Sequence, residues 1–428
     1  MIYQDTLDFA EDLDKKDELN SFRAEFLIPR HHGKDAIYLC GNSLGLQPKS
    51  AAKYLDGILN TWKDLAVEGW FQGDDPWLQY HEQLKQPLAT IIGASAKEIT
   101  VMNSLTVNLH LLFVSFYQPT TNKYKILMEG GAFPSDQYAV ESQVIYHGFK
   151  PEEAIIELFP REGELTLRKE DIVTAIKNNA DELALVLFAG INYYTGQVFD
   201  MAAIAKAGHE AGAYVGFDLA HAAGNVPLSM HDWDADFACW CSYKYMNSGP
   251  GGISGIFLHE KHFNNPKLKR FAGWWGYRPD KRFLMAPGFD PAAGAEGWQV
   301  STSPIPLMAL HKAALEIFEM AGGIPKLRKK SILLTGYLEY LISQINHRHN
   351  ENLFTIITPK NSYERGCQLS VVCKRNGKAI FKYLAEKGVI GDWREPDVIR
   401  LSPVPLYNSF KDVYEATKYL DESLAVAG

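Results

Sequence analysis

A lysine enclosed by two apolar runs is the first candidate for chemistry in this chain. Residues 235–240 predict a buried strand, Tyr243 and Lys244 follow it, turn formers at 247–252 reverse the backbone, and a second apolar run fills 253–258. An ammonium group withdrawn from water is costly, and the neutral amine that desolvation favours is a nucleophile suited to a Schiff base. The alternative is a loop lysine whose stem packs while its amine reaches water.

An acid at the end of the preceding strand strengthens the chemical interpretation. Residues 213–218 predict a buried strand that ends in Asp218. The carboxyl ends of strands in open α/β sheets face the ligand crevice, so we expect Asp218 and Lys244 in one crevice. Pyridoxal phosphate (PLP) requires an acid that pairs with its pyridine nitrogen and a lysine that forms an imine with it. The alternative for Asp218, a helix N-cap, leaves the lysine unexplained.

Alternating strands and helices are expected to position these two residues. Strands are predicted at 97–102, 125–128, 154–157, 183–188 and 214–217, and helices at 49–69, 77–92, 105–116, 135–146, 169–177 and 201–211. This alternation predicts an α/β fold with a mainly parallel central sheet and helices on both faces.

The last third of the chain has a different pattern, which indicates a smaller α+β C-terminal domain. A long helix begins at Ile305, with a helical pattern over 310–345, strands at 353–358, 367–373 and 398–401, and helices at 377–387 and 409–426. We expect an N-terminal arm over 1–45 that packs with the small domain, a large cofactor-binding domain over 46–305, and the small domain over 306–428.

Several short motifs in one order resemble the kynureninase family of fold-type I PLP-dependent enzymes, from near the start of the chain to the last helix. The stretches that carry the resemblance are 41–48 (GNSLGLQP), 103–110 (NSLTVNLH), 132–136 (AFPSD), 194–197 (YTGQ), 217–221 (FDLAH), 242–245 (SYKY) and 403–409 (PVPLYNS). Any one of them alone is a weak signal, and their order makes chance agreement improbable. The resemblance implies the fold-type I transferase fold, with PLP as cofactor and no metal.

The resemblance also implies roles for the residues of the cofactor site. Lys244 bonds the cofactor and carries the substrate α-proton, Asp218 pairs with the pyridine nitrogen, and Tyr243 is a phosphate ligand and candidate proton donor. Leu105 and Thr106 hold the phosphate through their backbones, Phe133 stacks on the ring, Asp136 and His221 lie beside it, and Trp274 and Thr302 complete the site. Taken alone, Phe133 is more often a core residue, Asp136 a helix-start acid, and His221 a packed histidine.

A second implied set binds the substrate, an amino acid. Arg400, at the end of a short strand, is expected to grip the α-carboxylate with its guanidinium fork, and Ser43, Trp70 and Thr302 are expected beside the substrate. The animal branch looks to have His and Asn where this chain has Trp70 and Thr302. This pair favours L-kynurenine over 3-hydroxy-L-kynurenine, because a buried hydroxyl without a partner is costly.

The resemblance therefore implies hydrolysis of L-kynurenine to anthranilate and L-alanine, within tryptophan catabolism. Whether the product feeds degradation or NAD biosynthesis is left open. Within the fold, the alternatives are a cysteine desulfurase or an aminotransferase, and Cys367 and Cys373 lie in an apolar strand pattern that is unsuited to an exposed sulfur carrier. A non-catalytic binding protein is a further alternative, which the intact Lys244 and Asp218 disfavour. The Gly- and Pro-rich stretch 271–304 is expected to reach the site of a second subunit, giving a homodimer.

Composition agrees with a globular enzyme. The 428 residues, of which 46% are hydrophobic and 22% charged, are enough for two or three domains. A net charge of −8 disfavours a nucleic-acid partner. No apolar run approaches about 18 residues, so no membrane partner is expected. The absence of a signal-peptide pattern and five cysteines without a disulfide pattern predict a cytoplasmic protein.

Overall fold

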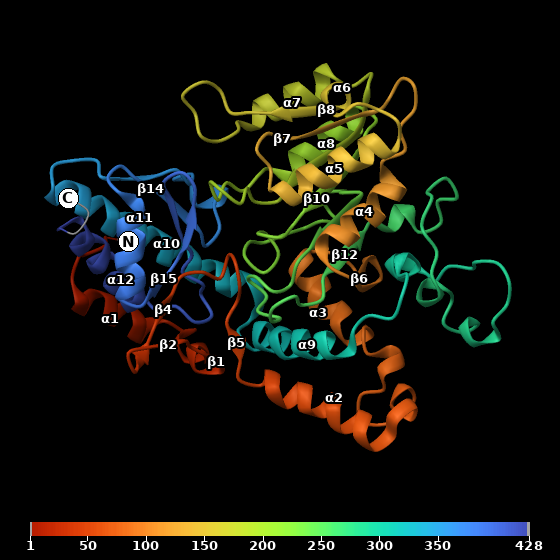
Figure 1. The fold of residues 1–428 in the computed structure, drawn as a ribbon, viewed down its shortest axis with the longest axis horizontal. Coiled ribbons are helices and arrows are strands. Elements are labelled where there is room, and N and C mark those ends of the chain that lie inside the picture. Colours follow the sequence, from red (N-terminus) through yellow and green to blue (C-terminus); the bar gives the residue numbers. More distant parts are fainter. Residues whose placement is uncertain (1, 426–428) are drawn as a thin grey trace.

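Seven strands form the main sheet of the protein, described here by a computed structural model of residues 2–425 (Figure 1). In sheet order they are β6 (Ile99–Val101), β12 (Gly255–Leu258), β11 (Phe237–Trp240), β10 (Tyr214–Asp218), β9 (Leu183–Ala189), β7 (Lys125–Glu129) and β8 (Ile155–Leu158). Strands β7 to β11 pair in parallel, and β12 runs antiparallel to both β11 and β6. The predicted mainly parallel α/β sheet is therefore confirmed.

Helices cover both faces of this sheet because successive strand residues point to opposite sides. Ile126, Met128 and Leu187 belong to the apolar core shared with α4 (Leu105–Phe116) and α5 (Pro134–Tyr146). Leu127 and Val186 belong to the core on the other side, with α3 (Glu82–Ile92), α7 (Lys169–Asn178) and α8 (Met201–Glu210). Helices α2 (Ala51–Leu65) and α9 (Ile305–Met320) pack on each other, α9 also packs on α3, and α6 (Pro151–Ala154) precedes β8.

A smaller antiparallel sheet forms the second body, seen on the left of Figure 1. Its strand order is β13 (Phe354–Ile356), β14 (Leu369–Cys373), β17 (Val398–Leu401) and β16 (Asp392–Arg394), and it carries α10 (Gly323–Arg348), α11 (Gly377–Glu386) and α12 (Phe410–Glu422). The N-terminal segment contacts this body, since α1 (Leu7–Lys16) packs on α12 and β4 (Ile37–Tyr38) pairs with β15 (Val389–Ile390). Short pairs β1–β5 (Phe26–Leu27, Gln47–Pro48) and β2–β3 (Arg30–His31, Lys34–Asp35) complete the segment.

Three differences from the sequence prediction lie in the last third of the chain. The helix predicted from Ile305 through 345 is two helices, because Gly322 and Gly323 have φ angles of +83° and +71° that end one helix and begin the next. Strand β16 was not predicted, since its Asp-Trp-Arg sequence is charged and lies at the sheet edge. The last helix, predicted to reach 426, ends at Glu422 and is followed by a 3-10 turn, and residue 426 lies outside the described range.

The predicted domain boundaries at 45 and 305 stay predictions. Helix α9 packs on α2 and α3 of the large body, and the chain passes to the small body at α10. No helix among residues 2–425 is long and apolar enough to cross a lipid bilayer.

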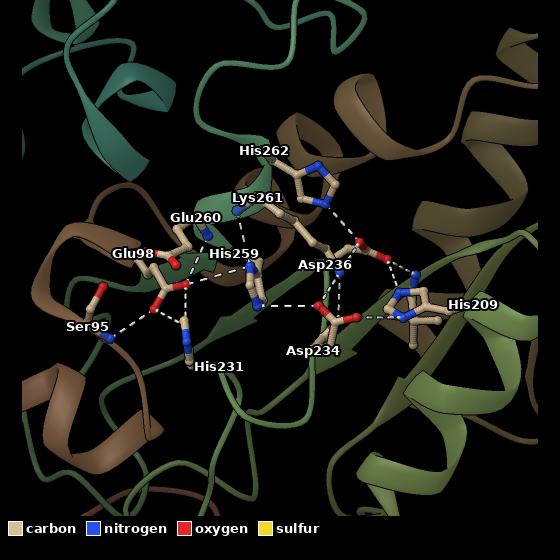
Figure 2. Close-up of polar contacts among 11 residues, drawn as sticks. Ser95, Glu98, His209, His231, Asp234, Asp236, His259, Glu260, Lys261 and His262 are labelled. Carbon is tan, nitrogen blue, oxygen red and sulfur yellow. Dashed lines mark hydrogen bonds and ion pairs between the residues drawn. The ribbon is translucent and has the colours of Figure 1, made fainter.

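A network of histidines and acids joins the strands at the sheet edge where β11 begins and β12 ends (Figure 2). Buried Asp236 accepts hydrogen bonds from the Val215 amide (2.6 Å), His209 Nε2 (2.9 Å) and His262 Nε2 (2.7 Å). Glu98, also buried, accepts from the Ser95 and Glu260 amides and lies 2.9 Å from His231 Nδ1.

A metal centre in this network is disfavoured by the geometry of its rings. Glu98, His231 and His259 bring one ligand-type atom each within 4.8 Å of one another. The two imidazoles, however, are stacked 4.9 Å apart with only 13° between their planes. Parallel rings cannot both direct an in-plane lone pair at one ion, so the arrangement favours a hydrogen-bonded network.

Candidate active site

A cavity of about 120 Å³ lies at the opposite edge of the sheet, where β7, β9, β10 and β11 end. It is lined by Leu105, Thr106, Glu129, Phe133, Ser135, Asp136, Ala189, Ile191, Tyr193, Asp218, Ala220, His221, Cys241, Tyr243 and Lys244. The fold thus brings together eight of the residues predicted for the cofactor site, from the ends of β7, β10 and β11 and the start of α4.

The Lys244 amine faces this cavity and has one close polar partner. Its Nζ lies 3.0 Å from His221 Nε2 and 5.9 Å from the centre of the Phe133 ring. Burial, with the positive charge of Lys244, lowers the pKa of His221 well below its ordinary value, so His221 is neutral. His221 Nδ1 is buried and without a hydrogen-bond partner.

Three buried carboxyl groups form the acidic end of the cavity. Asp218 ends β10 and accepts a hydrogen bond from the Ala220 amide at 2.6 Å. Burial raises the pKa of Asp136, and the charge of Asp218 raises it further, so Asp136 holds a proton and donates a hydrogen bond to Asp218. Burial also raises the pKa of Glu129 to about 8, and Glu129 accepts from Asn192 Nδ2 at 3.3 Å. Asp136 Oδ1 and Glu129 Oε2 lack partners.

The start of α4 forms the other end of the cavity. Ser104 is the N-cap in extended conformation, and Asn103 before it has a φ of +48° that turns the chain into the helix. The first amides of a helix are unpaired and favour anions, and no acidic residue occupies the first turn of α4. Burial raises the pKa of Tyr243 well above its ordinary value, so its hydroxyl stays protonated and can donate.

These residues fit PLP. One end of the cavity offers unpaired amides and a hydroxyl to a phosphate, and the other offers Asp218 and Asp136 to a protonated ring nitrogen. The exposed face of Phe133 borders the cavity beside Lys244. The buried polar atoms without partners, on Glu129, Asp136 and His221, are the groups that a polar ligand in this cavity would contact.

Arg400 and Ser43 lie together, outside the residues that line the cavity. The Arg400 side chain is only 1% exposed and donates through Nη1 to the Tyr193 carbonyl at 2.7 Å. Its Nη2 contacts Ser43 Oγ at 3.3 Å and pairs with the Asp392 carboxylate. Tyr193 does line the cavity, so its backbone connects the arginine to the cofactor site.

Trp70, Trp274 and Thr302 also lie outside the cavity lining. Trp70 packs edge-on against Trp77 at 5.6 Å and lies 5.8 Å from Trp275, and Trp274 lies 5.9 Å from Trp275. Thr302 is exposed. The roles predicted for these three residues stay predictions.

Four polar residues of the site were not predicted from the sequence. Glu129 ends β7 as Asp218 ends β10, so an acid at the end of a predicted strand was a usable signal. Ser135, whose hydroxyl lies 2.7 Å from Thr106 Oγ1, was inside a quoted motif. Asp392 and Arg394 had no signal, because their strand was not predicted.

Comparison with solved structures identifies the class of fold. A complex of the cystine C–S lyase C-DES with cysteine persulfide superimposes with a TM-score of 0.75 at 17% identity, covering 90% of this chain and 97% of that one. The Escherichia coli cysteine desulfurase CsdA gives a TM-score of 0.75 at 16% identity, covering 95% and 98%. At this identity the likeness shows the fold alone, and that fold is the fold-type I transferase fold predicted from the sequence.

Comparison with known sequences identifies the family. The model of the kynureninase C-terminal domain matches residues 327–420. Kynureninase from Flavobacterium psychrophilum is 56% identical over 99% of both chains, and that from Myxococcus xanthus is 50% identical over 98% of both. Kynureninase from Nematostella vectensis is 48% identical over 97% of this chain and 93% of its own. The chain belongs to the kynureninase family.

Proposed function

We propose that this enzyme hydrolyses the Cβ–Cγ bond of L-kynurenine, releasing anthranilate and L-alanine. One observation carries the proposal: a chain that matches kynureninases over its full length gathers Lys244, His221, Asp218, Asp136, Phe133 and the start of α4 around one cavity. Bound PLP supplies the electron sink for negative charge at the substrate α-carbon. Lys244 and Tyr243, with Leu105, Thr106, Phe133, Asp136, Asp218 and His221, would hold it.

Each group has a task that follows from its protonation state. The Lys244 amine moves a proton at the substrate α-carbon, with neutral His221 3.0 Å away as its hydrogen-bond partner. Asp218 is the acceptor at the acidic end, and proton-bearing Asp136 keeps a second negative charge from building up beside it. The Tyr243 hydroxyl stays protonated and can donate a proton to the departing group or a hydrogen bond to phosphate.

On the substrate side, Arg400 is proposed to bind the α-carboxylate, with Ser43 beside it. The buried fork of Arg400, linked to the cavity through the Tyr193 carbonyl, supports this role. Trp70 and Thr302 are proposed to contact the aromatic end of the substrate and to favour L-kynurenine over its 3-hydroxy derivative. Trp70 belongs to an aromatic cluster with Trp77 and Trp275, which supports a flat apolar contact.

A two-fold homodimer is part of the proposal. Large apolar side chains stand exposed on α2, on the turn after it and on the 271–289 stretch: Trp62, Val67, Phe71, Phe271, Trp274, Phe283, Leu284, Met285 and Phe289. Exposed apolar groups of this density favour a partner surface, here a second copy. Trp274 and Thr302 lie outside the cavity of their own chain, which supports a contribution to the partner's site.

A cysteine desulfurase activity is disfavoured by the thiols. Such an enzyme needs an accessible cysteine to receive sulfur, whereas Cys40, Cys239, Cys241, Cys367 and Cys373 are all buried. Burial raises the pKa of Cys367 and of Cys373 to about 12 each, so neither is a thiolate at neutral pH. We propose a cytoplasmic enzyme of tryptophan catabolism, whose product can serve either degradation or NAD biosynthesis.

Anthranilate release from L-kynurenine, followed by fluorescence with the PLP-loaded protein, tests the proposal. Lys244→Ala is expected to abolish release, and its unchanged circular dichroism spectrum would show that the loss is chemical. Asp218→Asn should also be severe, because a neutral partner no longer favours a protonated ring nitrogen. Substantial release by Lys244→Ala would contradict the assignment.

A further inference from the structure

The guanidinium group proposed to bind the substrate carboxylate is already paired with a carboxylate of the chain itself. Asp392 and Arg400 are directly opposite each other in the β16–β17 pair, and the Asp392 Oδ2 atom contacts Arg400 Nη2. The same oxygen accepts a hydrogen bond from Ser43 Oγ and lies 3.2 Å from Arg394 Nη2. One carboxylate oxygen therefore engages both Ser43 and Arg400, the two groups proposed for the substrate carboxylate.

Arg400 cannot be reached by a ligand in this conformation. Its side chain is 1% exposed, and it is held from the other side by the Tyr193 carbonyl at 2.7 Å. Its Nε is buried without a hydrogen-bond partner, so Asp392 does not engage every donor of the guanidinium group. A carboxylate that engaged the fork through two oxygens would satisfy it better.

The group that covers Arg400 lies on the element best suited to move. Strand β16 is the edge strand of the small sheet, three residues long, and Arg394 on it is 38% exposed. Arg400 lies on β17, which is paired on both sides, by β14 and β16. Displacement is therefore cheaper for Asp392 than for Arg400.

The charges of Asp392, Arg394 and Arg400 leave one positive charge that a further carboxylate can neutralise. Arg394 and Arg400 carry two positive charges and Asp392 one negative charge, while His221, also near, is neutral. A ligand carboxylate can pair with Arg400 while Asp392 stays paired with Arg394, which lies on the same strand as Asp392. Each guanidinium then has one carboxylate, and no buried charge is left unpaired.

We propose that Asp392 is an internal occupant of the carboxylate site, which a substrate carboxylate displaces from Arg400 toward Arg394. The inference rests on the proposed role of Arg400 in binding the α-carboxylate. It makes Asp392 and Arg394 positioning residues that set carboxylate affinity without contacting the reacting atoms. Ligands with a carboxylate compete with Asp392, and ligands without one do not.

The experiment measures binding of L-alanine and of L-alaninamide, which lacks the carboxylate, to the PLP-loaded protein by calorimetry. Asp392→Asn keeps the side-chain volume and removes the competing charge, so L-alanine should bind at least about fivefold more tightly, because the binding-competent fraction rises. Arg394→Gln removes the alternative partner of Asp392 and should weaken L-alanine binding severalfold. Both variants should leave the affinity for L-alaninamide unchanged.

The matched control is Glu395→Gln, the same charge change at an exposed position of the same segment, where the partner is Lys378 at 2.8 Å. It should leave both affinities unchanged. Unchanged or weaker L-alanine binding in Asp392→Asn would overturn the proposal. Because removing one partner of a buried charge can impair folding, Arg394→Gln is an independent second test, and failure to weaken L-alanine binding there would also overturn it.

Arg400→Lys separates this inference from the function on which it rests. Weaker L-alanine binding in Arg400→Lys, together with no gain in Asp392→Asn, would reject internal occupancy and keep the role of Arg400. Unchanged L-alanine binding in Arg400→Lys would reject the role of Arg400 itself. Tighter L-alanine binding in Asp392→Asn, together with weaker L-alanine binding in Arg400→Lys, would support both the internal occupancy by Asp392 and the role of Arg400.

Discussion

Glu129 is a carboxyl group of the cavity whose pKa lies near neutral pH. It is 2% exposed, and burial followed by the charge of Asp218 raises its pKa to about 8. An acid whose pKa is raised in the folded state binds its proton more tightly there, so its contribution to stability falls as pH rises from the unfolded pKa, near 4, to about 8. Above that value the contribution is constant.

Glu129→Gln should remove this loss, because the amide stays neutral at every pH. The thermal midpoint of the variant, relative to that of the parent, should rise between pH 5 and 8. The corresponding gain in the free energy of unfolding is at most about 5 kcal/mol. The measurement uses cofactor-free protein, because a bound cofactor adds its own charges. Glu157→Gln, an exposed neighbour on β8, is the matched control and should follow the parent. A pH-independent difference in Glu129→Gln would show that Glu129 is ionised throughout.

Substrate preference is predicted to depend on two side chains, Trp70 and Thr302. The parent should favour L-kynurenine over 3-hydroxy-L-kynurenine in kcat/KM by roughly ten- to a hundredfold, since a buried hydroxyl without a partner costs about 1–3 kcal/mol. The double variant Trp70→His, Thr302→Asn should shift the ratio toward the hydroxylated substrate. Trp70→Phe controls for lost packing on Trp77 and Trp275. Equal or reversed preference in the parent would refute the prediction.

At the scale of elements, Asp236 links β10, β11, α8 and the turn after β12 (Figure 2). Although burial pushes the pKa of Asp236 upward, hydrogen bonds from His209 and His262 hold it well below its ordinary value. A depressed carboxyl pKa gives stability that is present above the unfolded pKa, near 4, and is lost as pH falls toward the folded value.

Asp236→Asn should therefore destabilise the protein at pH 7, by about 3–5 kcal/mol, because it leaves buried donors unmatched. Thermal melts of parent and variant should differ widely at pH 7 and converge below pH 4. Asp232→Asn, an exposed acid four residues earlier, is the control and should match the parent. A small loss at pH 7 would mean that the histidines find other partners.

At the scale of the whole molecule, the site is predicted to need two chains. Lys244→Ala and Trp274→Ala should each be inactive, and mixing them under subunit exchange should restore about a quarter of the parent activity, since half of the dimers are mixed and each has one intact site. Lys244→Ala mixed with Asp218→Asn should restore none, because both residues line the same cavity of one chain. A fully active monomer in light scattering would exclude this arrangement.

The class of fold and the chemical centre of the site could be predicted from local patterns in the sequence. Lys244 and Asp218 stand at the ends of strands that local apolar patterns predict, and the carboxyl ends of parallel strands meet at one edge, so local patterns were sufficient to bring them together. The seven predicted strands of the main sheet all form. Six of them are largely buried on both faces, as their apolar runs predict, and the seventh, β8, is a partly exposed edge strand.

The polar groups that face one another across long stretches of chain could be identified only in the folded structure. Asp392 and Ser43 are 349 residues apart, and their contact depends on an edge strand of charged residues that no apolar pattern marks. The proton on Asp136 depends on its burial and on the nearby charge of Asp218. Burial and charge proximity act through space, so protonation states and the pairing of Arg400 follow from the assembled fold.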